Sequence, residues 1–313
     1  MTLLHSTKSA TVSIRSGIGH AYSATGMWVQ EPLAGIPDCV LSLPLLQNAL
    51  RNLPSDAVPR ISGSKLEWIG AGFRWSIPLL ADEPAFERAD AAELWRSEID
   101  TGLLKQAAYA CSDEVAREPL WYVDVAGDYV GASNGRCGVL LDNPNRQSGE
   151  FQVHKSVVAL LPEGKVTVVK YDNATAFEWR EHRISMADCA QPMQLCKMIG
   201  QVMPSGNHFG SAAVSKCMFS DALATACACC QDGSNMRTAL AGNELVIEAG
   251  KDASFRRELP IEGSGQSELT LNPRFVSMAI RGLSDRIEVA FFKDAIRLVS
   301  GKSKAVVMAI RQL

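Results

Sequence analysis

Four of the ionisable residues in the stretch E-W-R-E-H-R, at 178–183, stand close enough for an acid, a base and an imidazole to transfer protons. They are Glu178, Arg180, Glu181 and His182. The stretch lies in a strand-like region, and on a strand neighbouring side chains point to opposite faces. The sequence supplies no nucleophile with a base and an orienting group beside them. An exposed hairpin explains the cluster better than an active site, so we predict that the chain is not an enzyme.

The nine cysteines are the other candidates for site chemistry, because two of them form the motif C-x-x-C. Cys227 and Cys230 lie in a run of small residues that is typical of a closely packed helix. A zinc site needs a second pair of ligands, and the nearby His208 and Cys217 lack metal spacing. The G-I-G at 17–19 is too short for a phosphate-binding loop. We therefore predict reduced, buried thiols, no metal and no cofactor.

Length and composition are those of a folded protein with more than one domain. The chain has 313 residues, of which 47% are hydrophobic and 21% charged, so two or three domains are expected. Lys and Arg number 31 against 34 Asp and Glu, so no overall basic field indicates nucleic acid, although a local one remains open. No apolar run is long enough to cross a bilayer, and the first residues lack the pattern of a signal peptide. We expect a cytoplasmic protein without a membrane partner.

The elements that position these residues repeat along the chain. Segments with helical periodicity start at residues 43, 100, 154, 216 and 273, so the steps are 57, 54, 62 and 57 residues. Their ranges are 43–53, 100–111, 154–161, 216–229 and 273–283. Each is followed by short alternating stretches separated by Gly, Asn or Asp, as in antiparallel hairpins. Each repeat is thus one helix laid on an antiparallel meander.

Two such units are expected to pair, because one alone cannot bury its apolar faces. The predicted fold class is α+β, with three two-unit domains at residues 1–90, 91–204 and 205–313. Residues 1–38 carry strand patterns but no helical one. The first domain is therefore predicted to lack its opening strand and helix.

The last nine residues, A-V-V-M-A-I-R-Q-L, form a β-branched and apolar run. Chain ends fray unless something holds them, so an apolar terminus suggests a strand docked at a sheet edge, where it could line a groove. The alternative is a plain last strand that closes a core.

The repeats and several motifs together resemble the bacterial DNA polymerase III β sliding clamp family nearly end to end. The third predicted domain carries the best match, with N-E-L-V-I-E-A at 243–249, L-N-P-R-F-V-S-M-A-I-R-G-L at 271–283, R-I-E-V-A at 286–290 and the terminal nine residues. In the second, A-S-N-G-R-C-G-V at 132–139 is similar to the family's turn beside its partner pocket. In the first, G-F-R-W-S-I-P at 72–78 is similar to part of the second half-domain.

The resemblance implies a ring-forming DNA clamp fold, in which a head-to-tail homodimer encircles double-stranded DNA of any sequence and the helices line the hole. Basic residues on the helices would then face the DNA, namely Arg51, Lys105, Lys155, Lys216, Arg274 and Arg281. Arg274 and Arg281 lie seven residues apart and would share one helix face. For each residue the alternative is an ordinary solvated helix surface.

The resemblance also implies a pocket between the second and third domains that binds short, partly apolar peptides of the DNA polymerase and the clamp loader. Its implied walls are Ser133, Gly135, Arg136, Val202, Val306, Val307, Met308, Ile310 and Arg311. Ring closure would join Trp75 and Ile77 of one subunit to the helix around Ala228 and Cys229 of another. Trp75 could equally be a core residue.

The sequence departs from the family's pattern at several of these places. Ala309 stands where the family usually has Pro, and Arg136 and Cys137 stand where it has His and then Arg. Residues 196–203 replace a charged or aromatic-rich segment. The alternative function is a clamp-like interaction protein, monomeric or non-encircling, that binds clamp partners without forming a ring.

Overall fold

The computed structural model describes residue 4 and residues 9–22, 27–54, 57–70, 72–81, 92–146, 149–230, 235–250 and 255–310. The chain divides into two compact units, Met1–Ile99 with Leu160–Asp188 and Asp100–Ala159 with Cys189–Leu313. The domain boundaries near residues 90 and 204 stay predictions, because each unit takes residues from both sides of one of them.

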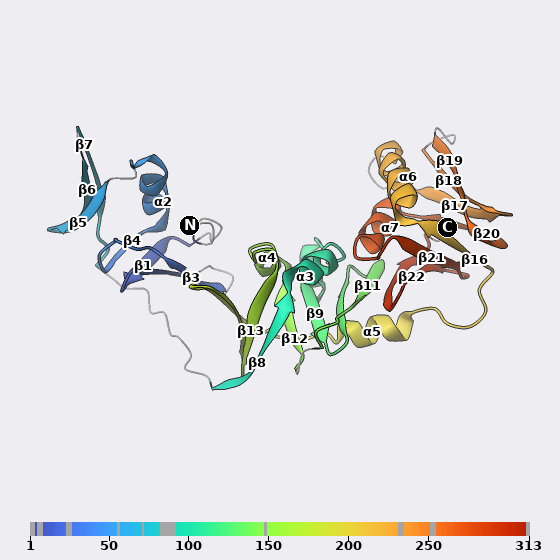
Figure 1. The fold of residues 1–313 in the computed structure, drawn as a ribbon, viewed down its shortest axis with the longest axis horizontal. Helices are drawn as coiled ribbons and strands as arrows, with labels where there is room; N and C mark the ends of the chain where they lie inside the picture. Colours follow the sequence, from blue (N-terminus) through green and yellow to red (C-terminus); the bar gives the residue numbers. More distant parts are fainter. Residues whose placement is uncertain are drawn as a thin grey trace. The chain divides into compact units, whose positions relative to one another are not determined.

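The first unit contains two antiparallel sheets among its described residues (Figure 1). The larger has the order β4-β1-β2-β3-β15-β14-β13-β8, and the smaller has the order β5-β6-β7. Ile184 of β15 lies opposite Val29 of β3, so segments far apart in the chain share one sheet. The elements are β1 (Thr11–Arg15), β2 (Ile18–Tyr22), β3 (Met27–Pro32), β4 (Cys39–Ser42), α2 (Leu43–Asn52), β5 (Val58–Ser62), β6 (Lys65–Gly70), β7 (Phe73–Pro78), β8 (Glu93–Asp100), β13 (Lys165–Tyr171), β14 (Ala174–Trp179) and β15 (His182–Ala187).

The second unit is built on one long antiparallel sheet of described strands, in the order β12-β9-β10-β11-β23-β22-β21-β16-β20-β17-β18-β19. Helices α6 and α7 pack side by side, as do α3 and α4 (Figure 1). The elements are α3 (Thr101–Ala108), the 3-10 helix η1 (Val115–Trp121), β9 (Tyr122–Ala126), β10 (Tyr129–Ser133), β11 (Cys137–Asp142), β12 (Phe151–His154), α4 (Lys155–Val158), α5 (Leu195–Val202), β16 (Gly210–Ser215), α6 (Lys216–Cys229), β17 (Met236–Ala241), β18 (Glu244–Ala249), β19 (Phe255–Pro260), β20 (Glu262–Leu271), α7 (Pro273–Ile280), β21 (Arg286–Phe291), β22 (Ala295–Ser300) and β23 (Ser303–Met308).

The helices follow from local sequence signals. The side chains of Asp100 and Asn272 accept hydrogen bonds from backbone amides in the first turns of α3 and α7, which is ordinary N-capping. Each of the five predicted helical segments contains a helix, and the α+β class is confirmed. Helix α4 is shorter than predicted, because Pro162 and Gly164 follow closely after it and disfavour continuation. Helix α5 was not predicted.

The prediction that the terminal strand lies at a sheet edge is wrong. β23 lies inside the long sheet, with Val306 opposite Gly138 of β11 on one side and Arg297 of β22 on the other. Both neighbours use its backbone groups, so the strand is held along its full length.

Three smaller findings complete the fold. Leu4 has helical conformation and is 1% exposed, which differs from the prediction that no helix precedes the first strand. The cysteines are free; five are buried as predicted, whereas Cys39, Cys227 and Cys229 are half-buried and Cys217 is exposed. No helix in the described part of the chain is long and apolar enough to span a membrane.

Candidate functional site

A tight turn between β10 and β11 lies against the end of the terminal strand. The Ser133 hydroxyl accepts a hydrogen bond from the amide of Gly135 (3.0 Å), and the Asn134 side chain accepts one from the amide of Arg136 (2.8 Å). Gly135 has φ +81°, a left-handed conformation that favours glycine. The amide of Met308 donates to the Arg136 carbonyl over 3.0 Å. The structure thus brings together Ser133, Gly135, Arg136 and Met308.

The two valines of the terminal strand are buried, so they do not form an open wall. Val306 is 3% exposed and Val307 is fully buried, whereas Met308 is 41% exposed. Alternation along the strand puts Val306 and Met308 on one face of the sheet and Val307 on the other. Val306 is covered by α5, a helix that was not predicted from the sequence.

Helix α5 lies over β9, β10 and β11 and buries one side against them. Its Leu195, Cys196 and Ile199 form a buried cluster with Leu140 and Val306. The buried residues Leu195, Cys196 and Ile199 are one, three and four positions apart, which is helical spacing. This signal could have been found in the sequence L-C-K-M-I-G-Q-V. The segment is short and follows an irregular stretch, which hid that periodicity.

The first turn of α5 is held by a carboxylate from the sheet. Asp124 on β9 accepts the Cys196 amide at 2.8 Å, and Gln152 on β12 donates to both Asp124 (3.3 Å) and the Met193 carbonyl. A carboxylate at a helix N-terminus is favourable because the exposed amides there carry partial positive charge. Burial raises the pKa of Asp124, while the hydrogen bonds from Cys196 and Gln152 oppose that rise.

Two glycines under α5 leave room for its side chains. A Cβ at Gly131 would lie 2.8 Å from the Cys196 sulfur, and one at Gly138 would lie 3.1 to 3.4 Å from three carbons of Ile199. Ordinary carbon contacts are longer than this. The glycines therefore let the helix approach the sheet more closely than any other residue would.

The remaining predicted wall residues are dispersed. Val202 ends α5 and is 63% exposed. Ile310 is half-buried, and its amide donates to the Thr270 carbonyl of β20 at 2.9 Å. It lies in a small hollow with Ala309, Lys293 and Asp294. Arg311 lies outside the described residues.

Lys155, Lys216 and Arg281, which were predicted to face DNA, have partners within the protein. Lys155 pairs with the Asp113 carboxylate and donates to the Ser112 carbonyl at 2.5 Å. Lys216 donates to carbonyls at the end of α7, including that of Arg281 at 3.0 Å. The Arg281 guanidinium lies 3.8 Å from the centre of the Tyr109 ring, a cation–π contact. An ion pair offsets the positive charge of a side chain, and a hydrogen bond or cation–π contact restricts its movement. Each of these contacts therefore weakens the attraction of the group for a DNA phosphate.

The remaining predicted cations differ in their exposure. Arg51 on α2 and Arg274 on α7 are exposed, and Lys105 on α3 is half-buried. Each lies on a separate helix, as the repeat predicted.

The residues predicted for ring closure lie near two sheet edges. β7 is an edge of the three-stranded sheet, where Trp75 is half-buried and Ile77 is 1% exposed. Ile77 is thus a core residue rather than a contact surface, because alternation points it inward. On α6, Ala228 is exposed and Cys229 is half-buried. Helix α6 packs against β18 and β19, and β19 is the edge strand of the long sheet.

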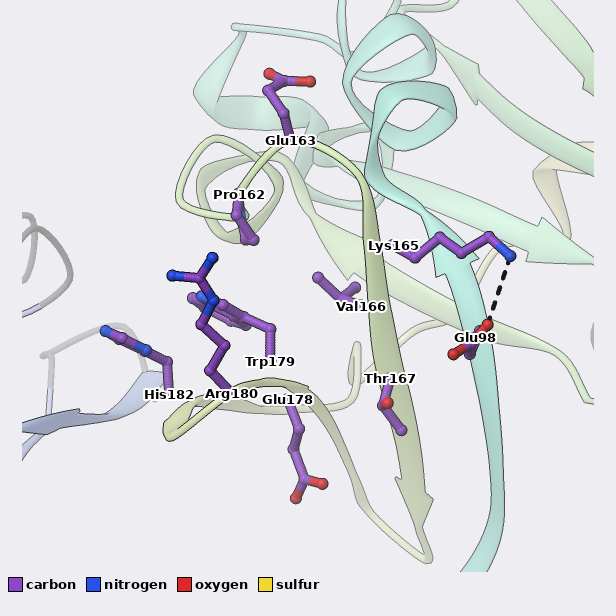
Figure 2. Close-up of a pocket in the computed structure, with 10 residues that line it drawn as sticks. All are labelled: Glu98, Pro162, Glu163, Lys165, Val166, Thr167, Glu178, Trp179, Arg180 and His182. Carbon is purple, nitrogen blue, oxygen red and sulfur yellow. Dashed lines mark ion pairs between the residues drawn. The ribbon is translucent and has the colours of Figure 1, made fainter.

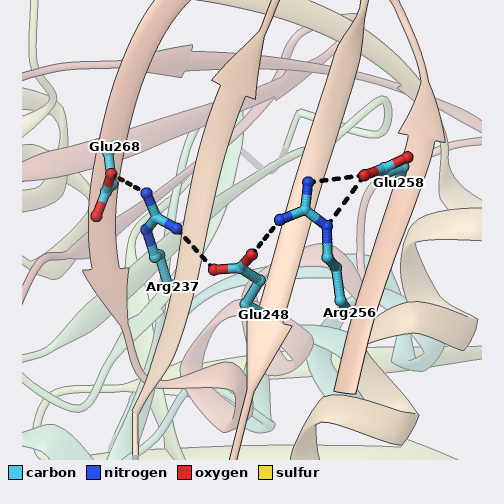
Figure 3. A network of polar contacts seen from close by, with 5 residues as sticks. All are labelled: Arg237, Glu248, Arg256, Glu258 and Glu268. Atoms are coloured by element: carbon cyan, nitrogen blue, oxygen red, sulfur yellow. Dashed lines mark hydrogen bonds and ion pairs between the residues drawn. The ribbon is translucent and has the colours of Figure 1, made fainter. Parts of the chain in front are cut away.

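An alternating row of charges crosses the strands beside that edge (Figure 3). Arg237 bridges Glu268 (2.5 Å) and Glu248 (2.7 Å), and Arg256 bridges Glu248 (2.5 Å) and Glu258 (2.7 Å). The hydrogen bonds from Arg237 hold the pKa of Glu248 and of Glu268 below the ordinary value. Neighbouring strands therefore carry opposite charges at facing positions, which pins their register.

Of the four ionisable candidates at 178–182, Glu178, Arg180 and His182 line a hollow of about 480 Å³ at the β14–β15 hairpin, and Glu181 does not (Figure 2). The rings of Trp179 and His182 stack, with their centroids 5.6 Å apart. Glu178 points away from Arg180 in Figure 2 and is paired with Arg96 (2.7 Å) and Arg183 (3.0 Å). Glu178 is thus held in ion pairs, whereas His182 is stacked on Trp179 and its buried Nδ1 has no hydrogen-bond partner. This arrangement does not aim the acid and the imidazole at a common point.

Among the described residues, no group of three His, Cys, Asp or Glu side chains could hold a metal ion.

Comparisons with known proteins find the fold but no close sequence relative. No protein-family model matches the sequence. No curated protein matches it either. Solved structures match along nearly the whole chain. The β sliding clamp of C. crescentus has a TM-score of 0.81 at 15% identity, covering 99% of this chain and 96% of that one.

Two further structures agree. The DNA polymerase sliding clamp of Pseudomonas aeruginosa has a TM-score of 0.79 at 13% identity, with 99% and 93% covered. The DNA polymerase III β subunit of Thermotoga maritima has a TM-score of 0.74 at 14% identity, with 97% and 91% covered.

Proposed function

From its sliding-clamp fold, we propose that this chain is a DNA sliding clamp. It encircles double-stranded DNA as a head-to-tail homodimer. A DNA polymerase and a clamp loader bind it through short peptide segments of their own, and the clamp thereby tethers the polymerase to DNA. The observation that carries the proposal is the match of the whole chain, rather than one domain, to clamp architecture. A ring holds DNA by topology, so it needs only weak contacts with phosphates and none with bases.

The two edge strands support the head-to-tail arrangement. β7 and β19 are edges of their sheets within the described residues, and edge strands present unpaired backbone groups to a further strand. Pairing β7 of one subunit with β19 of another would bring the exposed Arg74, which is paired with Glu67 at 2.6 Å in its own sheet, toward the charge row that ends at Glu258.

A second candidate is a clamp-like protein that binds clamp partners without closing a ring. Two observations favour it. Ile77 is buried, and Lys155, Lys216 and Arg281 are engaged within the protein. A chain with fewer available cations would hold DNA more weakly.

Mass in solution separates the two candidates. Light scattering coupled to size exclusion, over a concentration series, should give about twice the 33.8 kDa chain mass for a closed ring. The protein should then stay on nicked circular DNA through gel filtration and leave once the circle is cut. A mass of one chain at every concentration, with no retention on circles, would refute the ring and leave the second candidate.

A matched pair of variants tests the interface. Ala228→Arg places a bulky charge at the predicted interface, and Ala224→Arg places the same charge one turn earlier on α6, where the side chain is also exposed. We expect Ala228→Arg alone to yield monomers. Equal masses for both variants would remove the helix end from the interface.

A further inference from the structure

Strand β5 lacks, among the described strands, the neighbour that its counterparts in the repeat have. In each of the five other meanders, the first strand lies next to a strand that directly precedes a helix. β1 pairs with β4, β9 with β12, β17 with β20 and β21 with β16, and β13 lies next to β8. β5 begins the sixth meander, and within the described residues its one neighbour is β6 (Figure 1).

The exposure of β5 agrees with an uncovered edge. The first strands of the five other meanders each have at least three buried residues, whereas β5 has none. Val58 is 69% exposed and Ile61 is 44% exposed, and they lie on opposite faces of the strand. An edge strand that exposes apolar side chains on both faces is a template for pairing with a further strand.

The open edge of β5 presents the backbone groups of alternate residues. Gly63, with φ +59°, begins a two-residue turn to β6, and the flanking residues Ser62 and Lys65 face each other as a hydrogen-bonded pair. Alternation then turns the backbone groups of Ile61 and Pro59 away from β6. Pro59 has no N–H, which suits a position that faces solvent. The N–H of Ile61 and the carbonyl groups of both residues can therefore bond to a further strand.

One face of the small sheet defines the apolar side chains that such a strand should carry. Ile77, Leu66 and Ile61 face one another across β7, β6 and β5. Ile77 and Leu66 are buried, and the row becomes exposed at Ile61. An apolar residue beside Ile61 would continue the row and remove that side chain from water.

The other face of the small sheet defines the charge that the strand should carry. Glu67 is 4% exposed and pairs with Arg74 at 2.6 Å, whereas its contact with Arg60 is longer, at 3.9 Å. The Arg60 side chain is 62% exposed, and Lys65 is exposed on the same face. Within the described strands of this sheet, Glu67 is the one carboxylate among these cations. Asp56 lies outside the described residues. A second carboxylate beside Arg60 would complement this face.

We propose that β5 binds an extended segment of another protein as an antiparallel strand, in which apolar residues flank a carboxylate. The carboxylate would face Arg60, and the apolar residues would cover Ile61 and Pro59. The chain's own covering strand β8 has related chemistry, because Glu98 pairs with Lys165 of β13 at 3.6 Å and the adjacent Ile99 is fully buried. This inference does not depend on the proposed function, since the ring is proposed to use the opposite edge, β7.

The test uses the full chain and a fluorescein-labelled heptapeptide, Ser-Thr-Val-Glu-Val-Val-Ser, in fluorescence anisotropy. Ile61→Pro should weaken binding about fivefold or more, because it removes the N–H that the open edge donates and leaves the bonds between β5 and β6 in place. Ile61→Val is the matched control, since it keeps that N–H. Its affinity should equal that of the unaltered chain.

An exchange of charges tests the register and excludes a folding defect as the cause. Arg60→Glu should weaken binding of this peptide about threefold or more, because like charges would then face each other. The same variant should bind more tightly than the unaltered chain to a peptide with lysine in place of the glutamate. A folding defect would weaken the binding of both peptides.

Each outcome decides the proposal. The two losses, with the reversal of charge preference, would support it. No binding by the unaltered chain overturns it and leaves the proposed ring unaffected. Equal affinities for Ile61→Pro and Ile61→Val overturn it, and so does a loss of binding in Lys165→Glu, because the peptide would then replace β8 on β13. A mass in light scattering that exceeds two chains and falls in Ile61→Pro would assign the edge to a second copy of the chain instead.

Discussion

Replacing Gly138 with alanine should loosen α5 from the sheet. The new Cβ would lie 3.1, 3.2 and 3.4 Å from three carbons of Ile199, so Ile199 must shift by several tenths of an ångström. Overpacking of this kind costs about 1–3 kcal/mol. Residue 138 stays in β11 when α5 leaves the sheet, so the cost falls on the docking of α5. We expect a loss of about 1–2 kcal/mol in that docking.

The companion variant removes the other partner of this contact. Ile199→Ala deletes the three crowded carbons and should cost about 2–5 kcal/mol, because Ile199 is a buried cluster residue. In the double variant the alanine methyl at 138 meets no crowded neighbour and fills part of the cavity. The combined loss should fall short of the sum of the single losses by about 1 kcal/mol or more.

Hydrogen exchange of the segment 195–203, measured by mass spectrometry, is the suitable assay. A global melting curve would average over several cooperative units. A loss of 1–2 kcal/mol should speed exchange about 5- to 30-fold in α5 for Gly138→Ala. Strictly additive losses in the double variant would refute the contact between Gly138 and Ile199 as the cause.

Three further predictions concern other parts of the chain. Arg274→Ala should weaken retention on circular DNA and lower its salt dependence, whereas Lys155→Ala should do so less because Asp113 already neutralises Lys155; equal losses would contradict this. Burial raises the pKa of the Cys137 thiol to about 12, so at pH 8 iodoacetamide should modify the exposed Cys217 long before Cys137, and comparable rates would show that Cys137 is accessible. Arg237→Ala should lower stability by about 0.2–1 kcal/mol. Arg237 lowers the carboxyl pKa of Glu248 and of Glu268, so this loss should be the same from pH 7 to about 5 and vanish as the pH falls through those lowered pKa values. A loss that grows in acid would exclude the charge row as its cause.

The sequence was sufficient for the repeating elements of this protein. The five helical segments carry apolar spacing and capping residues within their own length, such as Asn272 before α7. The hairpins carry their turn residues between alternating runs, such as Gly242 with φ +63° between β17 and β18. Local patterns of this kind depend only on neighbouring residues, so they can be recognised without knowing the fold.

The tertiary structure decided what each candidate site residue could do. Sequence alternation does not reveal that β11 pairs with β23, and this pairing makes the terminal strand internal and buries Val307. Nor does it reveal that α5 covers Val306, because that contact depends on glycines some sixty residues earlier in the chain. Burial and pairing are set by residues distant in sequence, and a single sequence carries no direct record of which distant segments meet.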